Sequence, residues 1–144
     1  MYQDILVPTD GSEASTQAVD HAVDLATQYD ATIHALYVVD TGAYVSIEVG
    51  SEMIVEALRE EGREAVDAVA ATAGDAGVAS QTNVVEGDAH RKILDYTDEN
   101  DIDLIVMGTH GRRGVDRYLL GSVTERIVRS SPVPVLTVRQ ERDS

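Results

Sequence analysis

The chain has 144 residues, no cysteine and a formal net charge of −15 at pH 7. This length suits one domain with a sizeable core, and a chain without cysteine has neither disulfides nor thiol chemistry. So negative a charge argues against nucleic acid or an anionic membrane as the main partner, because both attract basic patches. No apolar run approaches the ~20 residues of a membrane span, and the first residues lack the pattern of a signal peptide. We therefore expect a single cytoplasmic domain over residues 1–144.

Short apolar segments alternate with amphipathic ones along the chain. The apolar segments have the composition of strands and cover residues 2–7, 31–39, 78–85, 104–107 and 133–138. The amphipathic segments have the periodicity of helices and cover residues 13–29, 52–72, 89–100 and 122–131. Ser12 and Asp88 are suited to cap the first and third helices, whereas residues 41–50 have no clear period and are expected to form a loop.

Polar residues interrupt two of these strands. The third predicted strand reads VASQTNVV, which is polar enough to indicate the edge of a sheet. His34 lies in the second predicted strand, and the four histidines of the chain show no spacing typical of metal ligands. We therefore interpret His34 as a half-buried histidine whose hydrogen bonds are satisfied.

The alternation of strands and helices predicts an α/β fold, in which a parallel sheet carries helices on both faces. In such sheets, ligands bind beyond the carboxyl ends of the strands, where the strand order reverses. The first strand ends at Pro8-Thr9-Asp10, and the fourth ends at Gly108. If these two strands are neighbours, Asp10 and the segment that follows Gly108 face one crevice.

The segment that follows the fourth strand is rich in glycine. Gly108, Gly111, Gly114 and Gly121 punctuate it, and Ser122 then opens a short helix. A strand, a glycine-rich loop and a helix N-terminus together present backbone N–H groups and a positive helix end to a phosphate. This stretch is therefore the candidate binding site of the chain.

The distribution of charge adds to this interpretation. Residues 1–100 hold 20 acidic and 4 basic residues, whereas residues 101–144 hold 6 acidic and 7 basic ones. Five arginines surround the glycine-rich segment: Arg112, Arg113, Arg117, Arg126 and Arg129. They either gather there to bind an anion or form ion pairs, with the local acids Asp116 and Glu125 or with the acidic remainder of the protein.

Several well-known phosphate and catalytic motifs are absent from the sequence. The sole lysine, Lys92, lies outside any glycine-rich context, which excludes a P-loop. The turn after the first strand reads PTDGSEAS rather than the G-x-G-x-x-G of a dinucleotide site. Neither an H-x-G-H motif nor the G-x-S-x-G elbow of an acyl-transfer serine occurs.

The spacing that does occur is G-x2-G-x9-G-S, formed by Gly108, Gly111, Gly121 and Ser122. Together with the segments ILVPTDGSEAS and SPVPVL, this spacing resembles the ATP-binding type of the universal stress proteins, the UspA family, over essentially the whole chain. The resemblance implies one doubly wound, five-stranded parallel sheet of order 3-2-1-4-5, Rossmann-like and similar to the adenine nucleotide alpha hydrolases. It also implies binding of ATP with Mg²⁺ or Mn²⁺.

The resemblance further implies which residues line the nucleotide site. They are Pro8, Thr9, Asp10, Val38, Met107, Gly108, His110, Gly111, Arg112, Gly121, Ser122, Val123 and Thr124. Asp10 would contact the ribose, or help to hold the metal through water or phosphate, while Val38 and Met107 would lie near the base. The glycines Gly108 and Gly111 lack a Cβ atom, so their backbone can approach phosphate oxygens closely.

Three polar residues of this set have alternative roles. The hydroxyl groups of Ser122 and Thr124 are suited to donate to phosphate, and the alternative role of Ser122 is that of a plain N-cap. His110 either flanks the phosphates or is a solvated loop residue. Arg112, with its neighbour Arg113, either neutralises phosphate charge or points to solvent.

The resemblance also implies a homodimer, in which the fifth strands pair antiparallel across a two-fold axis. The apolar residues of that strand are Val133, Val135, Leu136 and Val138. An apolar edge strand that stays unpaired can pair with other chains and lead to aggregation, and pairing within a dimer would prevent this. The function implied is a nucleotide-dependent stress regulator or sensor rather than an enzyme. The alternatives are a slow ATPase or phosphotransferase, and a dimeric interaction module without nucleotide.

The composition predicts how stability responds to salt. One lysine against ten arginines, combined with high acidity, suggests a cytoplasm rich in salt. There, screening is strong and a hydrated acidic surface keeps the protein in solution. We expect the melting temperature to fall as salt is lowered from molar to millimolar concentration, because the acidic groups then repel one another. A melting temperature that stays flat across the series would indicate an acidic protein without salt adaptation.

Overall fold

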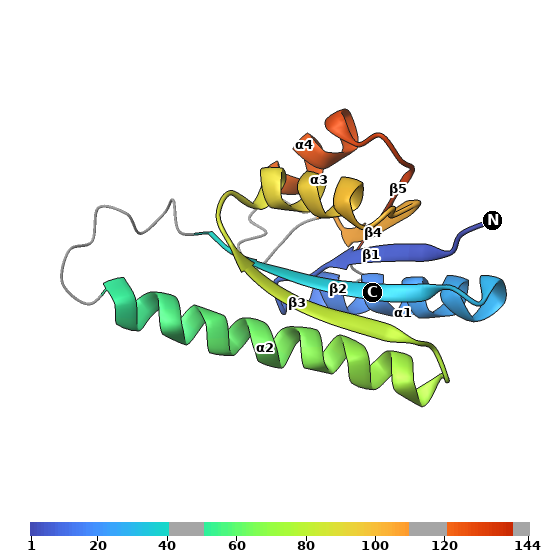
Figure 1. Ribbon diagram of the computed structural model, residues 1–144, viewed down its shortest axis with the longest axis horizontal. Coiled ribbons are helices and arrows are strands. Elements are labelled where there is room, and N and C mark those ends of the chain that lie inside the picture. Colours follow the sequence, from blue (N-terminus) through green and yellow to red (C-terminus); the bar gives the residue numbers. More distant parts are fainter. Residues whose placement is uncertain (41–50, 110–120, 140–144) are drawn as a thin grey trace, which may run out of the picture.

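The computed structural model describes residues 1–40, 51–109 and 121–139. These residues form, in order, β1 (Asp4–Pro8), α1 (Glu13–Tyr29), β2 (Thr32–Val39), α2 (Ser51–Asp75), β3 (Ser80–Glu86), α3 (Ala89–Glu99), β4 (Leu104–Gly108), α4 (Ser122–Ser130) and β5 (Val135–Val138). The strands form one parallel sheet of order β3-β2-β1-β4-β5 (Figure 1). The predicted order of elements and of strands is therefore confirmed, and polar β3 lies at an edge as expected.

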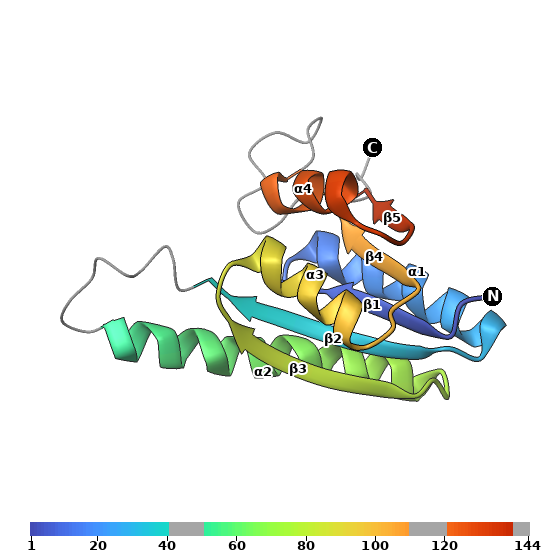
Figure 2. The same ribbon diagram turned by 45° about the horizontal axis from the view of Figure 1, so that its top comes forward.

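Two hydrophobic cores lie on the two faces of this sheet (Figures 1 and 2). Because side chains alternate along a strand, Ile5 and Val7 face α1 and α2, while Leu6 between them faces α3 and α4. The core under α1 and α2 is rich in small residues, among them Ala18, Ala22, Ala26, Ala31, Ala35 and Ala73. The core on the other face includes Leu36, Ile93, Ile105, Met107 and Ile127.

The reversal of strand order occurs at β1, which pairs with strands on both sides. Leu6 of β1 lies opposite His34 of β2 and also opposite Ile105 of β4. The carboxyl ends of β1 and β4 are thus neighbours at one edge of the sheet, as the sequence predicted. This pairing brings the turn after Pro8 and the segment after Gly108 to the same crevice.

Helix caps agree with the sequence, whereas several strand boundaries differ from it by one or two residues. Ser12 and Asp88 accept hydrogen bonds from the backbone of the third helical residues of α1 and α3. Strand β3 begins at Ser80 rather than residue 78, because α2 extends to Asp75 and the chain then turns. Strand β5 begins at Val135 rather than residue 133, because Val133 is held in a turn by the hydroxyl of Ser131.

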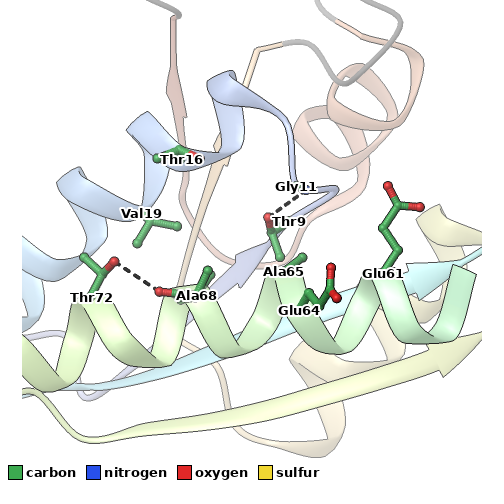
Figure 3. A pocket seen from close by; sticks show the side chains of 10 residues that line it. Thr9, Gly11, Thr16, Val19, Glu61, Glu64, Ala65, Ala68 and Thr72 are labelled. Carbon is green, nitrogen blue, oxygen red and sulfur yellow. Dashed lines mark hydrogen bonds between the residues drawn. The ribbon is translucent and has the colours of Figure 1, made fainter.

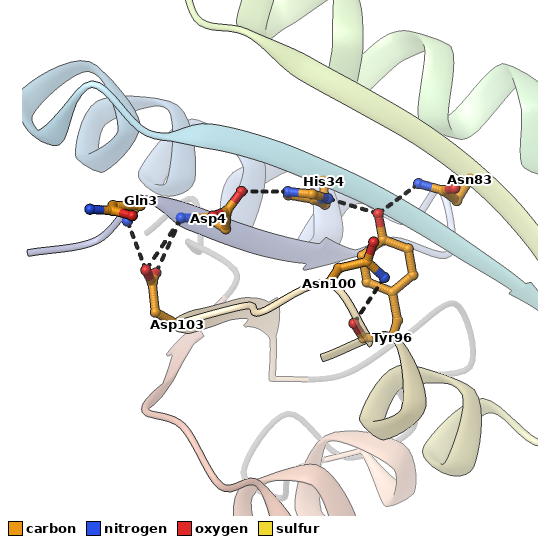
Figure 4. Close-up of polar contacts among 7 residues, drawn as sticks. All are labelled: Gln3, Asp4, His34, Asn83, Tyr96, Asn100 and Asp103. Carbon is orange, nitrogen blue, oxygen red and sulfur yellow. Dashed lines mark hydrogen bonds and ion pairs between the residues drawn. The ribbon is translucent and has the colours of Figure 1, made fainter. Parts of the chain in front are cut away.

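His34 is buried within a chain of hydrogen bonds that crosses the sheet (Figure 4). Its side chain is 3% exposed, so it is more deeply buried than predicted, but its ring nitrogens are satisfied as expected. Nδ1 lies 2.7 Å from the hydroxyl of Tyr96, and Nε2 lies 2.9 Å from Oδ1 of Asp4. Asn83 donates to the same Tyr96 hydroxyl over 2.9 Å. The hydroxyl proton therefore goes to Nδ1 of His34, which leaves Nε2 to donate to Asp4.

This network joins β1, β2, β3 and α3 in the half of the sheet away from the crevice. Burial raises the pKa of the Tyr96 hydroxyl, which keeps it a neutral donor. The role of His34 is therefore structural within this network, because both of its ring nitrogens already have partners.

A glycine inside α2 is explained by the packing of that helix on the sheet. A Cβ atom at Gly62 would lie 2.6 Å from Cδ1 of Tyr37, a β2 residue that is 5% exposed. Glycine costs ~1 kcal/mol relative to alanine in a helix interior. The close approach of α2 to the ring of Tyr37 offsets this cost.

Two glycine substitutions in α2 test this explanation. Gly62→Ala should lower the free energy of unfolding by ~1–3 kcal/mol, because overlap with the Tyr37 ring outweighs the gain in helix propensity. Gly74→Ala is the matched control, since a Cβ atom there meets nothing within 4 Å. It should be neutral or stabilise by up to ~1 kcal/mol. Urea unfolding measures both, and equal stabilisation by the two would mean that the ring moves aside at no cost.

Candidate functional site

The turn after β1 fixes the position of Asp10 at the crevice. Thr9 continues the sheet, because its N–H donates to the carbonyl of Leu36 over 2.9 Å. Gly11 has a φ of +80°, which favours glycine, and its N–H donates to Oγ1 of Thr9 over 3.2 Å. Oδ1 of Asp10 accepts hydrogen bonds from the backbone of Ser12 at 2.9 Å and from the hydroxyl of Ser15 at 2.8 Å. Hydrogen bonds therefore hold the Asp10 carboxylate at the N-terminus of α1.

The N-terminus of α4 lies at the end of β4. Its N-cap is Gly121, with no side-chain cap hydrogen bond among the described residues, so the interpretation of Ser122 as a plain N-cap is wrong. Ser122 is instead the first helical residue and is exposed. The N–H of Gly121 donates to the carbonyl of Thr109 over 2.6 Å, so the start of α4 lies beside the end of β4 at the crevice. An N-terminus without a side-chain cap favours an anion, because its first N–H groups have no partner within the helix.

Thr124 has a role different from the one predicted. Its side chain is buried, and Oγ1 donates to the carbonyl of Gly108 over 2.9 Å. A hydroxyl has one proton, so Thr124 does not offer that proton to a phosphate. It connects the first turn of α4 to the end of β4 instead, and so positions the helix end.

Gly108 is also explained by packing within the protein. A Cβ atom at this residue would lie 3.0 Å from both the carbonyl carbon and the Cβ atom of Ala14. The absence of a side chain thus lets the first turn of α1 approach the end of β4. The expected reason for this glycine is the approach of phosphate oxygens, whereas in the structure α1 takes up the space of its missing side chain.

The residues expected near the base lie on one face of the sheet. Met107 is 6% exposed in the core under α3 and α4, and Val38 and Val123 are partly buried against the same core. Pro8, the last residue of β1, is buried. The structure thus brings Val38, Met107 and Val123 to the same side of the sheet as the N-terminus of α4.

Part of the predicted site lies outside the described residues. This applies to His110, Gly111, Arg112 and Arg113, and also to residues 41–50. Among the arginines near the segment, Arg129 pairs with Glu125 one helical turn away, with 2.8 Å between the nitrogen and the oxygen. The alternative of pairing with local acids therefore holds for Arg129, and an exposed pair of this kind contributes little stability.

The described residues offer no ready-made metal centre. Within residues 1–40, 51–109 and 121–139, no group of three or more His, Asp or Glu side chains is placed to hold a metal ion. Asp10 supplies a carboxylate, but its Oδ1 already accepts two hydrogen bonds. Mg²⁺ is commonly bound through one or two carboxylates plus substrate phosphates, so an ion here would depend on a bound nucleotide.

A surface groove lies between α1 and α2, on the face of the sheet opposite α4 (Figure 3). Its volume is about 350 Å³, and it is lined by Thr9, Gly11, Thr16, Val19, Glu61, Glu64, Ala65, Ala68, Val69 and Thr72. The small side chains of Ala65 and Ala68 leave it open. Sequence analysis did not predict this groove, because its existence depends on how the two helices pack.

Sequence analysis also missed Ser15, which contacts Asp10. The signal that could have found it is the spacing of Ser12 and Ser15, which is that of a capping box with serine in place of the usual Glu or Gln at the third helical position.

Comparison with known proteins identifies the family. The model of the universal stress protein family matches residues 1–139. The chain belongs to the universal stress protein family. Universal stress protein MJ0531 of Methanocaldococcus jannaschii is 41% identical to it over 144 residues, which cover 99% of this chain and 85% of that protein.

Solved structures agree with this assignment. The universal stress protein UspA from Lactobacillus plantarum is 33% identical, covers 96% of this chain and 98% of its own, and superposes with a TM-score of 0.83. A universal stress protein solved in complex with cAMP is 25% identical, with a TM-score of 0.76 and coverage of 97% of this chain and 99% of its own. Both share the Rossmann-like architecture of this universal stress protein.

A membrane span was not expected from the sequence. In the described part of this universal stress protein, no helix combines the length and the apolar character needed to cross a bilayer.

Proposed function

We propose that this universal stress protein binds ATP, together with Mg²⁺ or Mn²⁺, and acts as a nucleotide-dependent stress regulator or sensor in the cytoplasm. The observation that carries the proposal is the N-terminus of α4, which has a glycine N-cap without a side-chain hydrogen bond and lies at the end of β4. This is the place in an open α/β sheet where a phosphate is favoured. The relative solved in complex with cAMP, an adenine nucleotide, supports the choice of ligand.

In this proposal the phosphates lie over the first turn of α4. The backbone N–H groups of Ser122 and Val123 and the exposed hydroxyl of Ser122 are the donors. Gly111, Arg112 and His110 of the neighbouring segment complete the phosphate site. The bound metal ion would neutralise phosphate charge. Thr124 positions the helix through its bond to Gly108 rather than donating to the nucleotide.

The nucleoside would extend from the phosphates towards β1 and β2. Asp10 lies in the turn after β1, where its carboxylate can accept a hydrogen bond from a sugar hydroxyl. Val38 and Met107 supply apolar surface for the base on the α3 and α4 side of the sheet. This arrangement spans the neighbouring ends of β1 and β4, which the register of the sheet brings together.

Binding without efficient hydrolysis is what the described residues support. Hydrolysis needs a group that positions a water molecule or accepts its proton, together with charge stabilisation. Asp10, in the turn after β1, is the candidate for the group that accepts the proton of the water molecule. Its Oδ1, however, already accepts hydrogen bonds from the backbone of Ser12 and the hydroxyl of Ser15. We therefore favour a sensor over an ATPase.

We also propose that the protein is a homodimer through β5. Among the described strands, β5 pairs with β4 alone, so its other edge is open. Leu136 in the middle of this strand is 38% exposed. Antiparallel pairing with the β5 strand of a second copy would cover both the edge and this side chain.

Binding of ATP and the role of the α4 N-terminus can be tested together by calorimetry in molar salt. Wild-type protein should bind ATP, and Ser122→Ala should weaken binding by ~1–3 kcal/mol through loss of a hydrogen bond to a charged phosphate. Ser122→Asp should weaken binding further by repulsion. The same change should leave the melting temperature equal or higher, because a carboxylate at a helix N-terminus is favourable by ~0.3–1 kcal/mol.

The matched control is Ser130→Asp, which places the same charge in the last turn of the same helix. It should lower the melting temperature and leave the affinity for ATP unchanged. Absence of both heat and co-purifying nucleotide in the wild-type protein would remove the proposal. Equal effects of the two aspartates on affinity would show that the α4 N-terminus is not the phosphate site.

The dimer can be tested by light scattering after size-exclusion chromatography. Leu136→Lys places a charge in the middle of the open edge and should yield a monomer that still binds ATP. Met53→Lys is the control, since Met53 is an apolar residue on α2 that is 78% exposed, and this variant should remain dimeric. A Leu136→Lys protein of dimeric mass would contradict pairing through β5.

A further inference from the structure

The start of α1 contains a variant of the capping box in which a third residue takes part. Ser12 is the N-cap, and its hydroxyl accepts the N–H of Ser15 over 3.2 Å. In a capping box, the third helical side chain reaches back to the N–H of the N-cap residue. Here the N–H of Ser12 donates to Oδ1 of Asp10 instead, over 2.9 Å. The side chain at the third position, Ser15, is directed to the same carboxylate oxygen.

The hydrogen bonds of Ser15 fix the direction of its one proton. The Ser15 side chain is buried, and its Oγ accepts from the backbone of Asp10 at 3.3 Å and from the hydroxyl of Ser12 at 3.1 Å. It donates to Oδ1 of Asp10 at 2.8 Å, the shortest of these contacts. The Ser15 hydroxyl therefore contacts both the backbone and the carboxylate of Asp10, and it does so from inside a regular helix.

Two donors from α1 thus hold one oxygen of the Asp10 carboxylate. Rotation of this side chain would break the bond to the Ser12 backbone and the bond to the Ser15 hydroxyl together. Side chains that are fixed before a ligand arrives lose less freedom on binding, which raises both affinity and selectivity. The N-terminus of α1 also favours the negative charge that it holds.

We infer that Ser15 is a positioning residue of the nucleotide site, which sets the direction of the Asp10 carboxylate towards a sugar hydroxyl. The inference rests on the proposed function, because the direction of Asp10 matters to a ligand only if a nucleoside lies beside it. Ser15 acts through Asp10, since its own side chain is buried beneath the turn. The property that it controls is the preference for ATP over analogues that lack a sugar hydroxyl.

The experiment compares Ser15→Ala with Ser12→Ala in the full-length protein. Both variants remove one hydroxyl from the same helix end, but Ser12→Ala leaves the bond from the Ser15 hydroxyl to Asp10 intact. Calorimetry with ATP, 2′-deoxy-ATP and 3′-deoxy-ATP gives the sugar selectivity of each protein. We expect wild-type protein to bind at least one deoxy analogue about tenfold more weakly than ATP, the effect of one hydrogen bond to a charged group.

Ser15→Ala should bring the ratio of the affinities for ATP and the deoxy analogue close to one, mainly by weakening the binding of ATP. Ser12→Ala should keep the wild-type ratio while lowering the melting temperature, because it removes the cap and the bond from the Ser12 hydroxyl to Ser15 but neither of the two hydrogen bonds to Oδ1 of Asp10. In an Asp10→Ala background, which should itself have a ratio close to one, adding Ser15→Ala should change the ratio no further. That non-additivity would show that Ser15 acts through the carboxylate.

The outcomes separate this inference from the proposed function. If wild-type protein binds ATP and Ser15→Ala retains the wild-type ratio, the positioning role is overturned while the nucleotide site stands. The same conclusion follows if the wild-type protein binds all three nucleotides equally. If the wild-type protein binds none of them, the proposed function fails and the inference fails with it.

Discussion

The parallel pairing of β1 with both β2 and β4 is the constraint on which the candidate site depends. Because Leu6 is opposite His34 on one side and Ile105 on the other, the chain leaves the sheet at neighbouring points after Pro8 and after Gly108. The first of these exits leads to Asp10 and α1, and the second leads to α4. Two helix N-termini therefore meet the same edge of the sheet, and each brings N–H groups and a positive dipole end to it. A displaced register would separate them, whatever residues they carried.

The two N-termini are used in different ways. The start of α1 is capped by Ser12 and surrounded by Asp10 and Ser15, so the N–H groups of Ser12 and Ser15 both donate to side chains of the protein. The start of α4 has a glycine N-cap without such a side chain. Within the described residues, a carboxylate thus accepts hydrogen bonds at the start of α1, whereas the acidic residue in the first turn of α4, Glu125, pairs with Arg129. This difference directs the proposed phosphates to α4 and the proposed sugar to the turn before α1.

Close packing, rather than ligand access, explains several residues that frame this edge. Gly108 allows the first turn of α1 to approach β4, and Gly62 allows α2 to approach Tyr37. Thr124 uses its hydroxyl to connect α4 to the carbonyl of Gly108. These contacts fix the two helices relative to the sheet before any ligand is considered. A site whose supporting residues are held in this way presents its donors and acceptors in a set geometry.

Residue patterns along the chain were enough to predict the order of elements, the parallel sheet, the caps at Ser12 and Asp88 and the edge position of β3. These features follow from periodicity and from short-range chemistry between residues a few positions apart. The tertiary structure alone decided that Gly108 packs against Ala14, that Thr124 bonds to a carbonyl and that Ser15 holds Asp10. The first two connect residues distant in the chain, and the third needs the exact path of a turn, so neither periodicity nor composition contains them. Of the predicted site, His110, Gly111 and Arg112 lie outside the described residues and stay predictions.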